Sequence, residues 1–388
     1  MRAGGLGRGR HMGAALREQN LGPARWLVVS GEAGDCFRAL GGHMRAEIRE
    51  AVTEWTSTQR LREHASASPG REQLAAVRSA TQTGFAAEWA ELAALAAGAG
   101  VPVEDLALLN FRGDLGHVKG SFDCSDLAWR RGRSFIAHNE DQGASMTGCC
   151  VLLTLAIDGL PPVCAFWCPM FLPSNAFWVT DGLVLSIDSL TVPEPGPWAG
   201  RHFIARGLQR RCRTVAETIG YLRANPCASG YAYTVGDYPA GSNDRRGNHG
   251  DGAATGRVVG VEAVRDEHHV VEVGGSAGPL FWHTNHARFM PGTIGAETCQ
   301  RAGVLAAAPV PDGEPDMAWF LRLLAGAPVP DGVRVDPSAE RPFLTLCTFV
   351  ADLTGGMAAL QWRDEKPVHV PLRHLVAPAR HEHQAIVS

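Results

Sequence analysis

Cys124 is the residue whose type and surroundings best fit covalent catalysis. It lies in the segment Gly-Ser-Phe-Asp-Cys-Ser-Asp, residues 120–126, shortly before a strand-like run that ends at His138 and the tripeptide Asn139-Glu140-Asp141. A cysteine with a free α-amino group carries a nucleophile and a base together, because that amine has a pKa of about 8 and can accept the thiol proton. Inside a chain the same nitrogen is an amide and is not basic. Breaking the bond between Asp123 and Cys124 would therefore create chemistry that the intact chain lacks.

The overall composition is that of a folded globular protein. Of the 388 residues 45% are hydrophobic and 20% charged, so the chain can bury a large core as one layered sandwich or as two domains. The formal net charge of −4 comes without a long run of either sign, so we expect no nucleic-acid and no membrane partner. A small-molecule substrate fits this composition better.

The apolar runs and the cysteine spacing bear on location and redox state. No run of about 18 apolar residues occurs, and none near the N-terminus has signal-peptide length, so we expect a soluble cytoplasmic protein. Ten cysteines in such a chain argue for thiols rather than for a disulfide framework. None has zinc-site spacing, since Cys149 and Cys150 are adjacent while Cys164 and Cys168 flank an apolar tripeptide. We expect no metal and no cofactor, and one reactive thiol among structural ones.

The elements that must position Cys124 change character at that residue. Residues 1–24 are rich in glycine and are expected to form a flexible tail. Residues 25–123 are expected to be mainly helical. Apolar positions recur at helical spacing over 44–64, a second helix is predicted over 85–97, and a third begins at Pro102, because proline suits the first turn of a helix.

Residues 124–388 are predicted to be rich in sheet. Thr214 and Glu217 have the spacing of a capping box at the start of a helix, and 240–252 is predicted to be a surface loop rather than a phosphate cradle. A late hairpin is expected from 344–353 and 357–362 around Thr354-Gly355-Gly356. Runs rich in β-branched and aromatic residues predict buried strands at 151–157, 163–167, 183–187, 257–264 and 269–273.

Several segments, taken in order, resemble the acyl-coenzyme A:6-aminopenicillanic acid acyltransferase family, a group of self-processing cysteine N-terminal-nucleophile enzymes. The likeness runs from about Arg25 to Pro371. The segments that carry it are 98–102 with 108–112, Cys124 with Asn139-Glu140-Asp141, 182–186, His283-Thr284-Asn285-His286, and 345–353.

The resemblance implies an α+β fold, the four-layer αββα sandwich of the N-terminal-nucleophile hydrolases. It also implies that the chain cuts itself between Asp123 and Cys124. The helical N-terminal fragment would then stay bound to the sheet-rich C-terminal fragment as a heterodimer, because both parts share one core.

The same resemblance assigns roles to single residues. Cys124 would attack the carbonyl of Asp123 in the intact chain, and afterwards the amide or thioester of a substrate. Asn285 would donate to the oxyanion, and Asp141 would orient the new amino group. Asn139 could bond the same group or the backbone, and Arg334 has a spacing that fits a family arginine near the site.

Each assignment has an ordinary structural alternative. Cys124 could be a buried, inert thiol, and Asn285 could close a turn after a strand. Asp141 and Asn139 could cap a loop after the strand that precedes them. His283 and His286 lack a third metal ligand at a suitable spacing and are expected to be scaffolding.

Two departures from the family pattern concern the sulfur. Ser125 stands where a threonine commonly follows the cysteine, which keeps the hydroxyl and loses a methyl group. Asp123 and Glu140 place negative charge close to Cys124, which would raise the pKa of the thiol and slow self-cleavage.

By this resemblance the chain would be an amidohydrolase or acyltransferase that works through an acyl-thioester on Cys124, with a role in specialised metabolism. The apolar segments 166–172 and 177–178 would either line an acyl pocket or pack in the core. An alternative from another class is an uncleaved homologue that binds a ligand without catalysis.

Overall fold

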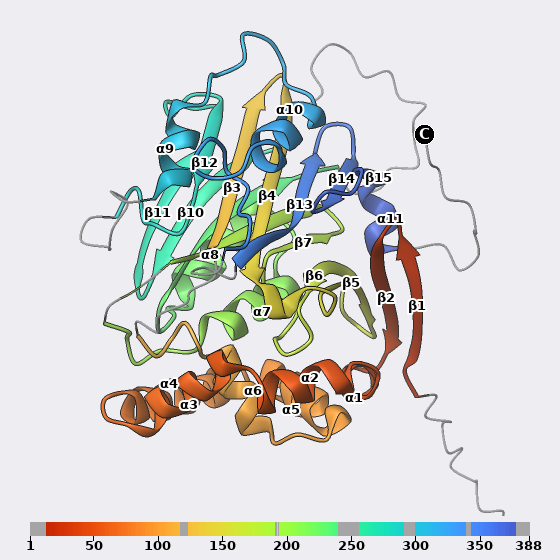
Figure 1. Cartoon of the computed structure of the whole chain (residues 1–388), viewed down its shortest axis with the longest axis vertical. Coiled ribbons are helices and arrows are strands. Elements are labelled where there is room, and N and C mark those ends of the chain that lie inside the picture. The colour runs from red at the N-terminus through yellow and green to blue at the C-terminus, as the bar shows by residue number, and fades with distance from the viewer. Residues whose placement is uncertain are drawn as a thin grey trace, which may run out of the picture.

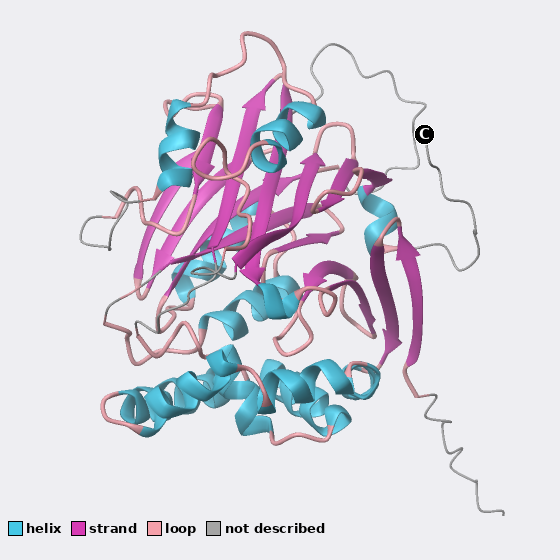
Figure 2. Ribbon diagram, in the orientation of Figure 1, coloured by secondary structure: helices cyan, strands magenta, loops and turns pink. Residues whose placement is uncertain are grey.

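The structure is a computed structural model that describes residues 13–116, 123–190, 192, 194–239, 256–290, 299–338 and 343–377. The described strands form two sheets that pack face to face, and helices cover both outer faces (Figures 1 and 2). The α+β class and the four-layer αββα arrangement expected above are therefore confirmed. No described helix is both long enough and apolar enough to cross a membrane.

The first sheet has nine strands. Neighbouring strands run antiparallel except for the parallel pair β2 and β5. Its middle strands are almost entirely buried, as expected for a sheet covered on both faces. In spatial order the strands are β1 (Ala15–Leu21), β2 (Ala24–Gly31), β5 (Val151–Ile157), β6 (Val163–Trp167), β7 (Phe177–Thr180), β8 (Leu183–Leu190), β9 (Gly230–Asp237), β10 (Val258–Val264) and β11 (Glu267–Glu272).

The second sheet has six strands, all antiparallel to their neighbours. Its strands β3 and β4 pack across β8 and β9 of the first sheet, so their inner faces lie at the centre of the molecule. In spatial order the strands are β12 (Leu280–His283), β3 (Asp123–Arg131), β4 (Arg133–Gly143), β13 (Phe343–Asp352), β14 (Met357–Trp362) and β15 (Val368–Pro371).

Six helices from the N-terminal third form a layer at one end of the molecule (Figure 1). One of them, α1, packs against β2 and β5 of the first sheet and against α5. The six are α1 (Ala33–His43), α2 (Arg45–Thr53), α3 (Thr56–Ser66), α4 (Gly70–Gly84), α5 (Ala86–Ala99) and α6 (Val103–Asn110).

The later helices complete the two outer layers. On the first sheet, α8 (Val215–Ala224) contacts β9, β10 and β11, while α7 (Arg201–Arg211) links α8 to α5, and α11 (Leu372–Val376) contacts β5 to β7. On the second sheet, α9 (Gln300–Ala307) contacts β12, α10 (Met317–Leu321) contacts β13, and the single-turn helix η3 (Arg322–Gly326) contacts β4.

Most predicted elements are confirmed, with shifted ends. The strands over 151–157 and 163–167, the late hairpin and the capping box of Thr214 and Glu217 are all present. The glycine-rich segment 240–252 lies outside the described residues.

Three expectations need correction. The expected flexible tail over 1–24 is wrong from Ala15 onward, because residues 15–21 pair with β2 as an edge strand; residues 1–12 lie outside the described part. The single helix expected over 44–64 is two helices, α2 and α3, with a break at Glu54 and Trp55. The strand expected to end at His138 continues to Gly143, so Asn139-Glu140-Asp141 belongs to β4 and caps no loop.

Candidate active site

Cys124 lies near the start of β3, opposite Glu140 of β4. Side chains alternate between the two faces of a strand, so Cys124 and Asp126 share the inner face with His138, Glu140 and Gln142. That face points toward the first sheet, and Cys124 as a residue is only 4% exposed. The predicted nucleophile therefore lies between the two sheets.

A chain of hydrogen bonds leads from the sulfur into the space between the sheets. The thiol of Cys124 donates to Oε2 of Glu140 at 3.5 Å, and Nε2 of His138 lies 3.0 Å from the same oxygen. Nδ1 of His138 lies 2.6 Å from Oδ1 of Asp126. The hydroxyls of Ser186 on β8 and Thr234 on β9 donate to Oδ2 of Asp126 at 2.9 and 2.6 Å. We call Cys124, Glu140, His138 and Asp126 the buried relay.

Charges within the buried relay follow from its burial. Burial raises the pKa of the Cys124 thiol well above its ordinary value, and the negative charge of Glu140 raises it further. Burial alone would lower the pKa of His138, but its hydrogen bonds to Asp126 and Glu140 raise that pKa to about 10. Near neutral pH the relay therefore holds a thiol and an imidazolium that bridges two carboxyl groups.

The backbone nitrogen of Cys124 is held by Asn285, which follows β12. That N–H donates to Oδ1 of Asn285 at 2.9 Å, and Nη2 of Arg301 donates to the same oxygen at 2.8 Å. Nδ2 of Asn285 donates to the carbonyl of Ser189 at 3.0 Å. Two donors on one side and an acceptor on the other fix the orientation of the amide. Asn285 thus bonds the nitrogen that a cut before Cys124 would free, while its expected role as an oxyanion donor stays a prediction.

Arg301 of α9 joins Asp141 to the nucleophile. Its guanidinium donates to the carbonyl oxygen of Cys124 and, at 2.8 Å, to the hydroxyl of Ser125. Oδ2 of Asp141 lies 3.5 Å from Nη1 of Arg301, and Oδ1 accepts the Thr345 hydroxyl at 2.5 Å. Burial raises the pKa of Asp141 to about 7 against the opposing pull of Arg301. Asp141 therefore lies near the nucleophile on the outer face of β4 and is connected to it through Arg301.

Two of the predicted site residues are not brought to Cys124. The side chain of Asn139 points to the outer face, where it donates to Leu324 and accepts from Thr348, both at 2.7 Å. The guanidinium of Arg334 pairs instead with Asp336 and Asp364. The arginine that contacts Cys124 is Arg301, which sequence reasoning missed.

His138 and Asp126 were also missed, although a sequence signal for them exists. A tight hairpin centred on Gly132 pairs Cys124 with Glu140 and Asp126 with His138. Cys124, Asp126, His138, Glu140 and Gln142 then share one face of the strand pair. The residues between them, such as Asn139 and Asp141, are polar too, so the signal lies in the hairpin pairing and not in an alternation of polar and apolar residues.

A cavity of about 20 Å³ lies beside the sulfur, which is room for about one water molecule. Among the described residues, the side-chain oxygens of Gln142 and Asn175 and Nε of Arg201 lack a hydrogen-bond partner, which indicates that the cavity takes a polar group. Its lining consists of Arg112, Cys124, Glu140, Gln142, Asn175, Ala176, Ile187, Ser189, Arg201 and Tyr231.

The segments expected either to line an acyl pocket or to pack in the core, 166–172 and 177–178, pack in the core. Phe177 stacks on Phe349 with ring centroids 4.1 Å apart, and Phe166 lies 5.8 Å from Phe177. None of these residues lines the cavity beside Cys124.

Two sets of three side chains in and beside the buried relay are of types that can bind a metal ion. Within each of the sets Cys124, His138, Glu140 and Asp126, His138, Asp188, ligand atoms lie within 4.8 Å of one another. Both nitrogens of His138 already bond a carboxylate, and each set offers three ligands where a structural zinc site needs four. A metal ion held by either set would have to replace a hydrogen bond of His138.

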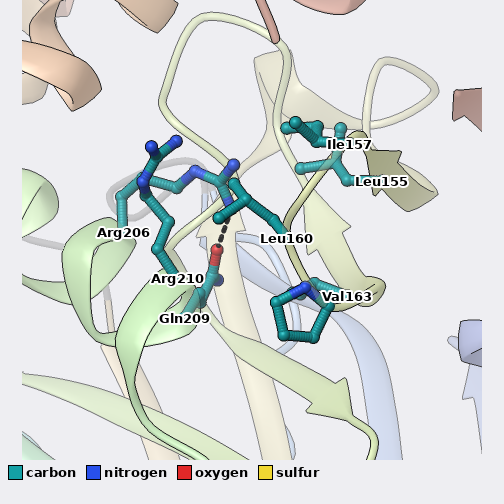
Figure 3. A pocket seen from close by; sticks show the side chains of 8 residues that line it. Leu155, Ile157, Leu160, Val163, Arg206, Gln209 and Arg210 are labelled. Carbon is teal, nitrogen blue, oxygen red and sulfur yellow. Dashed lines mark hydrogen bonds between the residues drawn. The ribbon is translucent and has the colours of Figure 1, made fainter. Parts of the chain in front are cut away.

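A second cavity, of about 10 Å³, lies away from the buried relay, between the strands β5 and β6 and α7 (Figure 3). The labelled apolar side chain beside Arg206 and Arg210 is that of Leu160, and Leu155 and Val163 also line the cavity. These arginines pair with Glu91 of α5, and Nη1 of Arg206 donates to Gln209 at 2.9 Å. The ion pairs connect α7 to α5, and the cavity beside α7 is smaller than a ligand needs.

In comparisons with known proteins, this chain is similar to solved structures but matches no family model and no curated sequence. A variant of conjugated bile acid hydrolase from Clostridium perfringens has a TM-score of 0.42 and 11% identity, over 64% of this chain and 93% of that chain. A second variant of that hydrolase has a TM-score of 0.36, 11% identity and coverages of 64% and 92%. Penicillin V acylase from Agrobacterium tumefaciens has a TM-score of 0.36, 10% identity and coverages of 66% and 89%.

Proposed function

We propose that this chain is a self-processing cysteine amidohydrolase or acyltransferase of the kind that the acyl-coenzyme A:6-aminopenicillanic acid acyltransferase family represents, with Cys124 as its nucleophile. One observation carries the proposal: the backbone N–H of Cys124 donates to Asn285 at 2.9 Å, while the sulfur of the same residue borders a buried polar cavity. A cut before Cys124 would leave a free amine that Asn285 already holds.

In the intact chain the sulfur of Cys124 attacks the carbonyl carbon of Asp123, and the peptide nitrogen leaves as an amine. Water then hydrolyses the resulting thioester and releases the carboxyl group of Asp123. In the processed enzyme the free amine takes the thiol proton, and the sulfur forms an acyl-thioester with an amide or thioester substrate. Water completes hydrolysis, whereas an amine acceptor completes transfer.

The two fragments would remain one folded unit. β1 and β2 precede the proposed cut, yet β2 pairs in parallel with β5, which follows it. The first fragment thus supplies two strands of the nine-stranded sheet as well as the helical layer α1 to α6. Separating the fragments would expose a sheet edge and a large apolar surface, so we propose a stable heterodimer.

Denaturing electrophoresis and intact-mass measurement test the proposal. The purified wild-type chain is expected to give two fragments, the larger beginning at Cys124. Cys124→Ala should give one intact chain, whereas Cys164→Ala, which changes another buried thiol, should still be processed. Incubation of the processed enzyme with a panel of amides and thioesters should add one acyl mass to the Cys124 fragment.

An unbroken wild-type chain that never takes up an acyl group would overturn the proposal. That result would leave the alternative of an uncleaved, ligand-binding homologue. Substrate turnover that survives Cys124→Ala would show that another residue is the nucleophile.

A further inference from the structure

Self-cleavage requires a base before the amine of Cys124 exists. In the intact chain the nitrogen of Cys124 is an amide that donates its hydrogen to Asn285. It has no basic lone pair, and burial keeps the sulfur in its thiol form. Another group must therefore take the thiol proton during the first attack.

The strand β4 supplies one carboxylate in direct contact with the thiol. Oε2 of Glu140 lies 3.5 Å from the sulfur, and the side chain of Glu140 is 2% exposed. Its other oxygen accepts a hydrogen bond from Gln142, and His138 bonds Oε2 itself. His138 is anchored in turn by Asp126, which two hydroxyls of the first sheet hold.

We propose, resting on the self-processing function above, that Glu140 is the base that accepts the thiol proton of Cys124 in the intact chain. His138 and Asp126 are positioning residues that keep the Glu140 carboxylate against the sulfur. Glu140 thus accepts the thiol proton before the cut, and the free amine of Cys124 accepts it afterwards.

The proton and electron pairs balance in this step. The S–H bond of Cys124 breaks, and its proton passes to Glu140 while the sulfur lone pair forms a bond to the carbonyl carbon of Asp123. When the tetrahedral intermediate collapses, the C–N bond breaks and the proton on Glu140 moves to the departing nitrogen. Glu140 returns to its carboxylate form, so no outside acid or base is consumed.

Other acidic groups near Cys124 are engaged elsewhere. Asp141 lies on the opposite face of β4 and bonds Thr345. Asp188 pairs with His283 at 3.2 Å. The other polar neighbours of Cys124, Gln142 and Asn285, are amides, and an amide does not accept a proton near neutral pH. Among the described residues, Glu140 is the carboxylate that forms a hydrogen bond with the thiol.

The chain also contains a matched arrangement without a cysteine. His283 of β12 lies between Asp188 at 3.2 Å and Glu262 of β10 at 2.9 Å, and all three side chains are buried. Glu262 therefore has the burial and the histidine partner of Glu140 but no thiol. Glu262→Gln controls for the cost of neutralising a buried carboxylate that is paired with a histidine.

A pulse of labelled chain made by cell-free translation allows the self-cleavage rate to be followed on denaturing gels. A positioned general base typically contributes about 10²- to 10⁴-fold to the rate of a reaction. We therefore expect Glu140→Gln to slow cleavage at least 100-fold, while Glu140→Asp, which keeps a carboxylate, restores part of the rate. Glu262→Gln should cleave within a few-fold of wild type, and Cys124→Ala should not cleave. Gel filtration and circular dichroism establish that each variant is folded.

The possible results separate the two proposals. If wild type is cleaved and folded Glu140→Gln is cleaved at the same rate, the role of Glu140 is overturned while the proposed function stands. An equal slowing by Glu140→Gln and Glu262→Gln would also overturn it, because the effect would then come from buried charge alone. If wild type is not cleaved, both proposals fall.

Discussion

At the scale of single residues, the thiols of this chain differ sharply in their readiness to react. Cys299, which precedes α9, is partly exposed and lies 3.9 Å from the hydroxyl of Thr284. Burial alone would raise the pKa of Cys299, but a hydrogen bond with His286 and the charge of Arg301 lower it to about 6. Burial instead raises the pKa of Cys36 and Cys164 to about 12.

We therefore predict that iodoacetamide labels Cys299 first at pH 7 in the Cys124→Ala chain, which stays uncut and lacks the proposed nucleophile. The rate should fall about tenfold for each pH unit below pH 6, because the thiolate is the reactive form. His286→Ala removes the hydrogen bond and should slow labelling at pH 7 by at least tenfold, since the pKa then returns toward its ordinary value. Peptide mass spectrometry after timed quenching measures the rates, with Cys299→Ser as the blank. Faster labelling of any other cysteine would contradict the prediction.

The candidate site could be predicted in part from residue types. Cys124, Asp141 and Asn285 do lie together around one backbone segment. Asn139 does not reach Cys124, because the strand continues through it and the pleat turns it to the opposite face, where it bonds the backbone of Leu324. Arg301 could not be found, because a long-range contact between α9 and β3 leaves no local pattern in the sequence.

At the scale of elements, the contact of α1 with α5 depends on two glycines. A Cβ atom on Gly41 would lie 2.0 Å from the carbonyl oxygen of Leu95, and one on Gly98 would lie 2.1 Å from that of Arg38. Both distances are far shorter than van der Waals contact. The two helices approach so closely because neither glycine has a side chain.

Gly41→Ala is therefore expected to lower the free energy of unfolding by about 1 to 3 kcal/mol, the usual cost of overpacking. This outcome runs against helix propensity, which favours alanine over glycine by about 1 kcal/mol. Gly220→Ala on α8 is the matched control, since a Cβ there meets nothing within 4 Å. It should raise the free energy of unfolding by about 0.5 to 1 kcal/mol. Urea titrations followed by circular dichroism compare the two, and a stabilised Gly41→Ala would show that the helices can separate without cost.

Element predictions succeeded where burial produces a strong local pattern. β5 and β6 are apolar throughout and were predicted with their correct ends. β1 was missed because it is an edge strand with mixed exposure and no apolar run. The break between α2 and α3 was missed because helical spacing of apolar residues continues across Glu54 and Trp55, while the backbone does not.

At the scale of the whole molecule, the interface between the two sheets contains histidines whose protonation changes with pH. His138 and His283 both lie there, each between two carboxyl groups. Burial alone would lower their pKa values, but those hydrogen bonds raise them to about 10 for His138 and about 9 for His283. An exposed histidine in the unfolded chain has a pKa of about 6.5. Between those values the folded chain holds protons that the unfolded chain has released.

Stability should therefore fall as the pH rises from 7 to 9. The contribution of each histidine is fully present below pH 6.5, and it is lost as the pH rises through 9 for His283 and 10 for His138. Each can change the free energy of unfolding by up to about 1.4 kcal/mol per pH unit within its window.

Urea unfolding of the Cys124→Ala chain, which stays uncut, measures this slope. Replacing His283 by glutamine should flatten the slope up to pH 9, and replacing His138 should flatten it up to pH 10. An unchanged slope in both variants would mean that neither histidine holds an extra proton in the folded chain.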